Sequence, residues 1–253
     1  MVPKMKNITT FDFTSLNQYK KIFCLVSGGI DSTYLFEMIK QSIDLSKIFP
    51  TNCFNPFESS TTLNTIKQNT NFISIKPDSE YNYGQILKNA FLNLPKSFQM
   101  RKYSKKVFEC CYYIKHKAFM NNPIFSESNS VVISGIKYND GMQRRMFLKS
   151  LIDGKERSKG VKILNFPTFY HIHKNGQNYC YPFRDYLNKD LPVDIVAELR
   201  NTYPNLTHSG CSICPVLLRF EKRILKSKEP FDLIRLNTSI EYAKRLNVYH
   251  IYK

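Results

Sequence analysis

The chain has 253 residues, of which 42% are hydrophobic and 14% aromatic, with 16 Tyr, 19 Phe and no Trp. This length and composition suit a folded globular protein with one large α/β domain, and they exclude an intrinsically disordered chain. Lys and Arg number 37 against 20 Asp and Glu, and the formal charge of +17 favours polyphosphates, nucleic acid or anionic surfaces as partners without choosing among them.

Membrane and secretory segments are not expected. No stretch of the chain reaches the roughly 18 apolar residues of a membrane span, and the opening MVPKMKNITTFDF lacks the apolar centre of a signal peptide. We therefore expect a cytoplasmic protein without a membrane partner. In that reducing compartment the seven cysteines indicate metal or redox chemistry rather than a disulfide framework.

Short apolar runs alternate with amphipathic segments along the first part of the chain. Strands are predicted, in chain order, over residues 21–26, 47–54, 71–76, 130–136 and 161–169. Helices are predicted between them, over residues 32–41, 63–68 and 83–92. The alternation predicts an α/β fold in which helices flank a parallel sheet.

The pattern changes after Asp185. Helices are predicted over residues 188–200 and 232–245, and the Pro/Gly/Cys-rich stretch YPNLTHSGCSICP separates them. We expect two domains: a nucleotide-binding α/β domain over residues 1–185, and a helical, cysteine-bearing C-terminal section over residues 186–253.

The stretch SGGIDS, residues 27–32, lies where the first strand ends and the first helix begins. The first N–H groups of a helix carry partial positive charge and suit a phosphate. Gly28 and Gly29 let the backbone approach an anion closely, while Ser27 and Ser32 offer hydroxyl donors. Asp31 can cap the helix or hold a Mg²⁺ that screens the phosphates. The turn therefore predicts a pyrophosphate-binding site.

SGGIDS resembles the PP-loop of the ATP pyrophosphatase and adenine nucleotide alpha-hydrolase superfamily. No lysine follows the glycines, which excludes the common P-loop. The resemblance implies a Rossmann-like sheet of the adenine nucleotide alpha-hydrolase type. It also implies chemistry at the α-phosphate of ATP, or binding of a sulfonucleotide in the same place. The adenine is then expected near the ends of the first strands, beside Leu25, Val26 and Phe54.

Four cysteines form two spaced sets, the adjacent Cys110 and Cys111 and the CxxC pair Cys211 and Cys214. Four thiolates can hold a [4Fe–4S] cluster or a tetrahedral zinc, and adjacent ligands fit zinc less easily. Unliganded thiols are the remaining alternative. Cys24 and Cys53 fall in apolar strand patterns and are interpreted as small core residues.

The segment ECCYYIKHKAF followed by a distant GCxxCP is similar to the cluster-binding motif of the phosphoadenosine phosphosulfate (PAPS) and adenosine phosphosulfate (APS) reductase family. In that motif a lysine follows the second cysteine by four positions, as Lys115 does here. The stretch SGIKYNDGMQRR resembles the family's Gly-x-Arg segment, with Lys137 in place of the arginine. The family also has an arginine later in the sequence that faces the phosphates, and Arg144 or Arg145 corresponds to it here. The resemblance covers residues 21–215 and implies that Lys115, Lys137, Arg144 and Arg145 neutralise charge at the α-phosphate.

Reductases of this family attack sulfur with a cysteine in a C-terminal Glu-Cys-Gly-ϕ-His type motif, and the last cysteine here is Cys214. The remaining features resemble the branch that inserts sulfur into nucleic acids, in which ATP adenylates the acceptor. The leading hypothesis is thus a PP-loop ATP pyrophosphatase of sulfur-transferase type, with ATP, Mg²⁺ and a [4Fe–4S] cluster, acting on DNA or tRNA with a sulfur donor protein.

Two alternatives stay open. One is a sulfonucleotide reductase with a displaced nucleophile such as Cys180, and the other is a non-catalytic protein that binds nucleotide or nucleic acid. The positive charge fits a nucleic-acid partner, and the basic stretch RKYSKK, residues 101–106, is the candidate contact, with a basic helix end lacking any partner as its alternative.

Overall fold

The computed structural model of the chain describes residues 12–55, 57, 61–69, 71–76, 79–99, 110–111, 113, 117–120, 122–137, 162–164, 170–174, 177–183, 191–204, 206, 211–228 and 230–252. The chain forms two compact units. Unit 1 comprises Met1–Asn52, Ser60–Ile73 and Asn122–Leu206, and unit 2 comprises Cys53–Ser59, Ser74–Asn121 and Thr207–Lys253.

These units differ from the continuous division expected at residue 185. Helix α7 (Val193–Thr202) was expected in the C-terminal section and belongs to unit 1. Cys110 and Cys111, expected in the nucleotide-binding domain, belong to unit 2 with the C-terminal helices. A change of composition along the sequence marks only consecutive segments, so it cannot detect a unit assembled from three separate ones.

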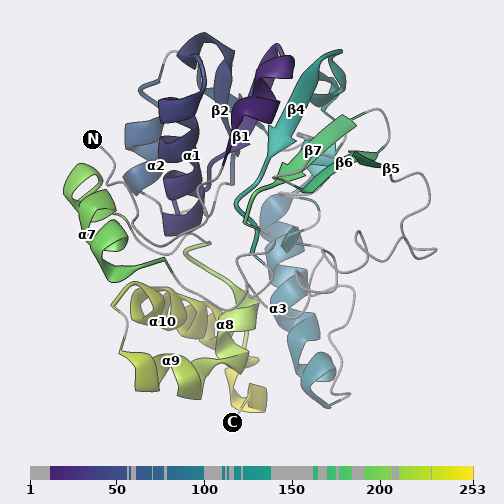
Figure 1. Cartoon of the computed structure of the whole chain (residues 1–253). Coiled ribbons are helices and arrows are strands. Elements are labelled where there is room, and N and C mark those ends of the chain that lie inside the picture. The colour runs from purple at the N-terminus through teal and green to yellow at the C-terminus, as the bar shows by residue number, and fades with distance from the viewer. Residues whose placement is uncertain are drawn as a thin grey trace. The chain divides into compact units, whose positions relative to one another are not determined.

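The described residues contain one sheet, with strands in the order β3-β2-β1-β4-β7-β6-β5. The strands are β1 (Lys21–Leu25), β2 (Ile48–Cys53), β3 (Ile73–Ile75), β4 (Ser130–Ile133), β5 (Lys162–Leu164), β6 (Tyr170–Lys174) and β7 (Gln177–Tyr181). Strand β1 pairs in parallel with β2 on one side and β4 on the other, and β4 pairs in parallel with β7 (Figure 1). The α/β class and the parallel sheet flanked by helices are therefore confirmed, and they fit a Rossmann-like fold.

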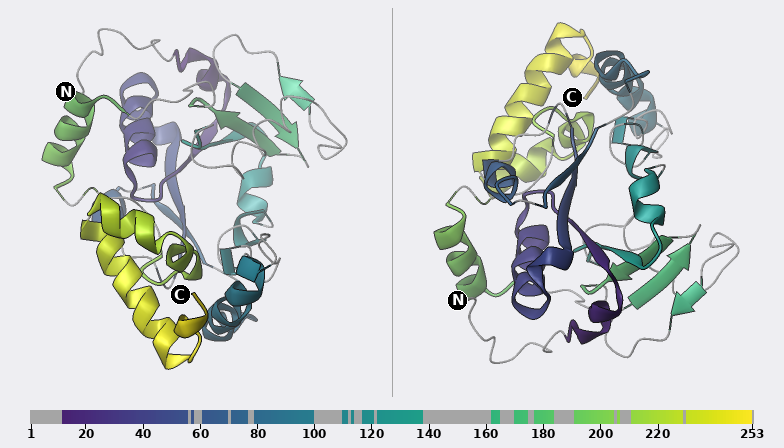
Figure 2. Two further views of the ribbon diagram at one scale, coloured as in Figure 1. Left: turned by 90° about the horizontal axis from the view of Figure 1, so that it is seen from below. Right: turned by 90° about the horizontal axis from the view of Figure 1, so that it is seen from above.

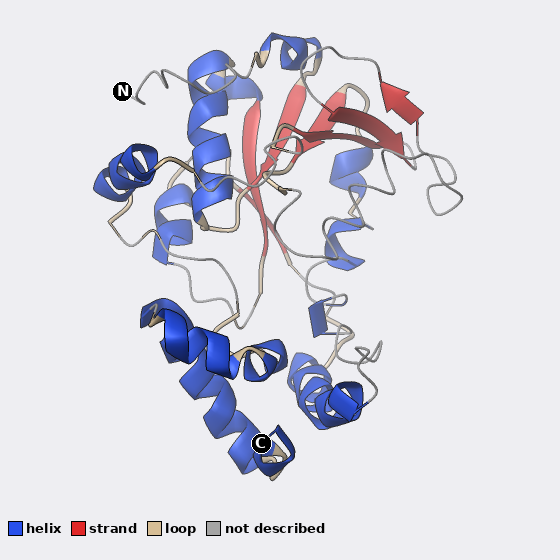
Figure 3. Ribbon diagram, turned by 60° about the horizontal axis from the view of Figure 1, so that its bottom comes forward, coloured by secondary structure: helices blue, strands red, loops and turns tan. Residues whose placement is uncertain are grey.

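The far edge of the sheet departs from the expectation. Strand β5 was predicted as a longer strand over residues 161–169 of a parallel sheet, but it covers three residues and pairs antiparallel with β6. Strand β6 pairs antiparallel with β7, and Figure 3 shows these strands in red. The two residues between β6 and β7 are Asn175 and Gly176, the dipeptide that most favours a two-residue hairpin.

The helices follow the predicted segments with shifted ends and some additions. They are α1 (Ile30–Ser42), α2 (Thr61–Ile66), α3 (Tyr83–Gln99), α5 (Ala118–Met120), α7, α8 (Pro215–Arg219), α9 (Glu221–Ser227) and α10 (Pro230–Arg245), with 3-10 turns η1 (Thr14–Gln18), η2 (Leu45–Lys47), η4 (Pro123–Ser126) and η6 (Tyr249–Tyr252). Helices α8 and α9 were not predicted. Among the described helices, none combines the length and the apolar character needed to cross a bilayer.

The core of unit 1 lies on the sheet beneath its helices. On β1, Ile22 and Cys24 face the apolar cluster that also holds Leu35 and Ile39 of α1. Phe23 packs on Phe49 and Phe125, with ring centroids 5.8 and 5.1 Å away. Burial of successive residues of β1 is the pattern of a parallel strand inside a sheet.

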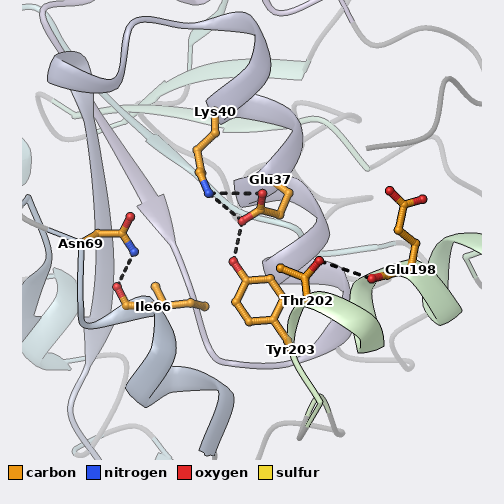
Figure 4. A network of polar contacts seen from close by, with 7 residues as sticks. All are labelled: Glu37, Lys40, Ile66, Asn69, Glu198, Thr202 and Tyr203. Carbon is orange, nitrogen blue, oxygen red and sulfur yellow. Dashed lines mark hydrogen bonds and ion pairs between the residues drawn. The ribbon is translucent and has the colours of Figure 1, made fainter. Parts of the chain in front are cut away.

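Helices α1 and α7 of unit 1 are joined by a polar network. The Tyr203 hydroxyl, just after α7, donates to Glu37 Oε1 on α1, and Lys40 Nζ donates to both oxygens of Glu37 at 2.9 and 3.2 Å (Figure 4). Burial raises the pKa of Tyr203, and the hydrogen bond to the Glu37 carboxylate raises it further. The phenol is thereby held protonated as the donor that connects the two helices.

Unit 2 has its own apolar cluster, contributed by α3, α8, α9 and α10. Leu87, Leu218, Ile224 and Leu236 are its buried members from the four helices. Helix α10 packs against both α8 and α9, the yellow-green helices of Figure 2. Cys110 also lies in this cluster, so the first of the paired cysteines is part of a hydrophobic core.

Candidate nucleotide site and cysteine cluster

The glycine turn lies at the carboxyl end of β1, in the middle of the sheet. From β1 the strand order continues to β2 and β3 on one side, and to β4 and β7 on the other. The connections leaving β1 and β4 therefore turn toward opposite edges of the sheet. In open α/β sheets ligands bind outside the carboxyl ends of the strands at such a reversal. The predicted phosphate-binding turn occupies that position.

The backbone of the turn uses its glycines as expected. Gly28 has φ 75°, in the left-handed region that glycine adopts without steric cost. Gly29 is the extended N-cap of α1, and the helical ladder starts with Thr33 N–H donating to Gly29 C=O at 3.0 Å. The amides of Ile30, Asp31 and Ser32 precede that ladder, as the first N–H groups of any helix do.

The two serines brace the turn from within. Ser27 N–H donates to Ser32 Oγ at 3.1 Å, and the two hydroxyl oxygens lie 3.0 Å apart. The Ser32 hydroxyl also donates to Gly29 C=O at 3.0 Å. The hydroxyls of Ser27 and Ser32 were predicted to donate hydrogen bonds to phosphate. In this structure the two serines hydrogen-bond within the loop and stabilise its conformation.

Lys137 and Asp31, which are 106 residues apart in sequence, form an ion pair. Lys137 Nζ lies 2.8 Å from Asp31 Oδ1, with the Lys137 side chain 8% exposed and the Asp31 side chain 30% exposed. Strand β4 ends at Ile133, three residues earlier than predicted, so residues 134–137 leave the sheet beside the glycine turn. Two of the predicted site residues are thus brought together by the pairing of β1 with β4.

Close packing links the two loops at this point. A Cβ built on Gly135 would lie 3.3 Å from the backbone oxygen of Asp31, closer than nearly all such contacts. It would also lie 3.5 Å from the Phe183 ring. Glycine at position 135 therefore allows the loop after β4 to approach the first turn of α1.

Asn52 is a site residue that the sequence reading missed. Its buried side chain, near the end of β2, donates to Val26 C=O at 2.7 Å, while Val26 N–H donates to Thr51 C=O at 2.9 Å. Both polar backbone groups of Val26 are held by β2, which fixes the entry to the turn. The available signal was a polar residue at the end of an otherwise buried strand.

The other predicted residues of the nucleotide site have different outcomes. Phe54 directly follows β2, is 44% exposed and belongs to unit 2, so its role beside an adenine stays a prediction. Lys115, Arg144 and Arg145, like the basic stretch 101–106, lie outside the described residues. Of the four predicted charge-neutralising residues, Lys137 is the one that the described structure places.

In unit 2, the CxxC segment and Cys111 come together. Burial raises the pKa of the Cys214 thiol to about 12, and the charges of Cys111 and Cys211 add to the rise. Cys111 and Cys211 are therefore near enough to Cys214 to influence its pKa. A hydrogen bond from Val216 N–H to the Cys214 sulfur and the charge of Arg235 act in the opposite direction.

The segment that carries Cys211 and Cys214 is fixed from several sides. Asn55 Nδ2 donates to Cys211 Sγ at 2.8 Å, and Arg235 Nε donates to Cys211 C=O at 2.8 Å. Cys214 is the N-cap of α8, and its N–H donates to Ser239 Oγ at 3.0 Å. Hydrogen bonds to cysteine sulfur are the contacts that tune thiolate ligands in metal sites.

The thiol set has the chemistry of a soft-metal or cluster site, but its geometry is not that of one. Within the described residues, no three His, Cys, Asp or Glu side chains are arranged so that they could hold a metal ion. Cys110 is buried in the apolar cluster of unit 2. The predicted ligand set of Cys110, Cys111, Cys211 and Cys214 stays a prediction.

The chain matches no protein-family model and no curated protein sequence. Its function must therefore be argued from the site itself.

Proposed function

We propose that the protein is a PP-loop ATP pyrophosphatase of the reductase-like type, with a Rossmann-like sheet of the adenine nucleotide alpha-hydrolase kind. It binds ATP with Mg²⁺ at the turn of residues 27–32 and adenylates an acceptor for sulfur transfer, the acceptor being nucleic acid. The observation that carries the proposal is the buried Lys137 beside Asp31, at the glycine turn where the strand order reverses.

The chain's own groups supply the parts that phosphate binding needs. The amides at the start of α1 and the left-handed Gly28 form a concave positive end for the α- and β-phosphates. Lys137, held by Asp31 in the absence of nucleotide, turns its charge to the phosphate oxygens when Asp31 coordinates Mg²⁺. The ion pair therefore keeps both charged groups at the site, and each compensates the charge of the other.

The proposed reaction is a displacement at the α-phosphorus. An acceptor oxygen forms a bond to the α-phosphorus. The bond between the α-phosphorus and the α–β bridging oxygen breaks, and pyrophosphate leaves with the bridging oxygen. Lys137 neutralises negative charge on the phosphoryl oxygens during transfer, a contribution typically worth about 100-fold or more in rate. A persulfide of a sulfur donor protein then attacks the activated acceptor carbon, and AMP leaves with the former acceptor oxygen. A second thiolate of the donor attacks the donor-side sulfur of the resulting disulfide, which releases the thiolated acceptor and leaves the donor with a disulfide of its own.

We propose that the four cysteines hold a [4Fe–4S] cluster, with zinc as the alternative metal. Cys110, Cys111, Cys211 and Cys214 would provide the four thiolates. Such a cluster would supply sulfur or redox chemistry to the second half-reaction. Purification without oxygen tests this part: a brown protein with iron and acid-labile sulfide supports the cluster, and a colourless protein with one zinc rejects it.

A sulfonucleotide reductase is disfavoured by the environment of Cys180. Its side chain is 0% exposed within β7, and burial raises the pKa of its thiol well above the ordinary value. A nucleophilic cysteine needs an accessible thiolate. Cys180 therefore does not replace the nucleophile that these reductases carry in their C-terminal motif.

The deciding experiment is turnover of α-labelled ATP without oxygen, with and without tRNA or DNA. We expect labelled AMP and released pyrophosphate, with the rate increased by the acceptor. Lys137→Met and Asp31→Asn should each lower the rate about 100-fold. Asp44→Asn, an exposed aspartate that caps η2, is the matched control and should leave the rate unchanged. Tight ATP binding without any AMP would replace this proposal with the non-catalytic one.

A further inference from the structure

Helices α8 and α9 of unit 2 carry a concentrated positive surface that the ATP reaction does not use. Between residues 219 and 228 there are five exposed cations and one acid. We call these cations the α8–α9 basic face, and they are Arg219, Lys222, Arg223, Lys226 and Lys228.

The packing of the two helices directs this face to solvent. Leu218 of α8 and Ile224 of α9 are buried in the apolar cluster of unit 2. On a helix, residues two positions from Ile224 in either direction point to the opposite side, and these are Lys222 and Lys226. The two lysines lie one turn apart, about 6 Å along the axis. Like charges at that spacing repel each other, so the arrangement does not serve helix stability.

Several ion pairs found among the described residues involve cations outside the α8–α9 basic face. Lys21, Lys40 and Lys244, for example, pair with Glu127, Glu37 and Glu241. Within the described part of the chain, Lys222, Arg223, Lys226 and Lys228 enter no such pair. The carboxylate of Glu221, the acid of this segment, accepts a hydrogen bond from the Tyr249 hydroxyl at 2.9 Å.

Two apolar side chains are exposed within the face. Phe220, at the joint of α8 and α9, is 41% exposed, and Leu225 is 50% exposed. Leu225 follows Lys222 by three positions and is its neighbour on the surface of α9, so the apolar and charged residues are mixed. A helix that binds a membrane surface instead separates a continuous apolar face from its cations. An aromatic ring among cations is the arrangement on which unpaired bases stack while the backbone phosphates are neutralised.

We propose that the α8–α9 basic face binds single-stranded nucleic acid. Lys222, Arg223 and Lys226 contact consecutive phosphates, and Phe220 stacks on a base. The inference goes beyond the proposed ATP reaction and does not require it. The face begins where the cysteine segment ends, because Cys214 caps α8 and Arg219 is its last residue. The five residues of α8 span about 8 Å, so a bound strand passes close to the CxxC thiols.

The test compares two triple variants of the full-length protein that change the net charge equally. Lys222→Glu, Arg223→Glu and Lys226→Glu reverse the basic face. Lys20→Glu, Lys67→Glu and Lys88→Glu reverse three other exposed lysines and form the matched control. The probe is a fluorescent 20-nucleotide single-stranded RNA, with duplex DNA and phosphatidylserine vesicles measured beside it, over a range of salt concentrations.

We expect the face variant to bind the RNA at least tenfold more weakly than the wild type, while the control binds with less than a threefold change. The slope of log affinity against log salt should become shallower by about 2, the value for three lost contacts to a single strand. Phe220→Leu should weaken binding about tenfold without changing that slope. Because charge reversal can destabilise α9, the milder variant with Lys222→Gln and Lys226→Gln is measured as well, and its change in log affinity should be about half that of the triple variant.

Equal loss in both triple variants would show that net charge alone binds RNA, and would overturn the proposal. Unchanged binding in the face variant, or binding only to duplex DNA or to vesicles, would overturn it too. ATP affinity is measured for every variant and should not change, since the face contributes no group to the glycine turn. A loss of RNA binding with intact ATP binding therefore separates this inference from the proposed function.

Discussion

The ion pair between Lys137 and Asp31 makes the most specific prediction about the nucleotide site. Replacing Lys137 by Met removes the cation but keeps an unbranched side chain of similar length in a buried position. This substitution removes the cation from the ion pair, whereas Asp31→Asn removes the carboxylate from it. The double variant removes both charges, so the four proteins form a thermodynamic cycle.

The size of the expected coupling follows from the distance and the burial. Two unit charges 2.8 Å apart attract by about 6 kcal/mol at an effective dielectric constant of 20 and by about 1.5 kcal/mol in water. The desolvation of Lys137 offsets part of this attraction, and Asp31 keeps 30% of its side-chain exposure. We therefore expect a coupling free energy of about 1–3 kcal/mol, above that of a surface pair.

Urea unfolding of the four proteins measures the coupling, and calorimetry with ATP and Mg²⁺ measures its connection to the nucleotide. Lys137→Met should weaken ATP binding about tenfold or more, as expected for loss of a charged hydrogen bond to a phosphate. Additive effects on stability, within about 0.5 kcal/mol, would show that the pair does not form in solution. Strong coupling with unchanged ATP affinity would show a structural ion pair that has no part in binding.

Three further predictions concern the turn, the thiols and the tyrosines. Gly28→Ala should lower the free energy of unfolding by about 1–2 kcal/mol and weaken ATP binding, because φ at this position is 75°, while Gly84→Ala in helix α3, whose new Cβ would only touch Asn82 Oδ1 at 3.4 Å, should lower neither. In native protein treated with iodoacetamide, mass spectrometry should find Cys24 and Cys180 unmodified after the half-buried Cys53 is labelled, since burial raises the pKa of both thiols; labelling of Cys180 at the same rate as Cys53 would contradict the structure. The raised pKa of Tyr203 means that the unfolded state loses its proton first, at about pH 10, so stability should fall as the pH rises above that value; Tyr203→Phe should reduce this fall in a urea series, and an unchanged slope would show that the phenol is exposed.

The sequence predicted the parallel part of the fold because periodicity reports which faces are buried. Strands β1, β2 and β4 and helices α1 and α10 lie where apolar spacing indicated them. The prediction for the edge of the sheet was wrong, although the sequence Asn175-Gly176 between two strand-like runs indicates a hairpin. The predicted strand 161–169 ended just before β6, and β6 and β7 were not predicted as strands, so the reversal was missed.

The site shows the same division between local and long-range information. The left-handed Gly28 and the cap of α1 by Gly29 follow from neighbouring residues and could be predicted. The contact of Asn52 with Val26 depends on the pairing of β1 with β2, so the sequence shows a polar residue near the end of a buried strand but not its partner. Lys137 was selected by resemblance, and its partner Asp31 by the turn, but their pairing needed the sheet order.

The α8–α9 basic face was missed for a different reason. Its cations alternate with Phe220, Ile224 and Leu225, so they are less dense along the sequence than the four cations of residues 101–106. The buried position of Ile224 and the exposed positions of Phe220 and Leu225 became visible only when α9 was placed on its cluster. Burial, rather than composition, separated the solvent side of this helix from its packed side.

The most direct test of the central claim is a crystal structure with a non-hydrolysable ATP analogue that carries a methylene group between the α- and β-phosphorus, together with Mg²⁺. The phosphate oxygens should lie about 2.7–3.2 Å from backbone nitrogens of residues 28–32, with the distance between Lys137 Nζ and Asp31 increased. A nucleotide bound elsewhere, with the 2.8 Å ion pair intact and no phosphate on these amides, would contradict the account.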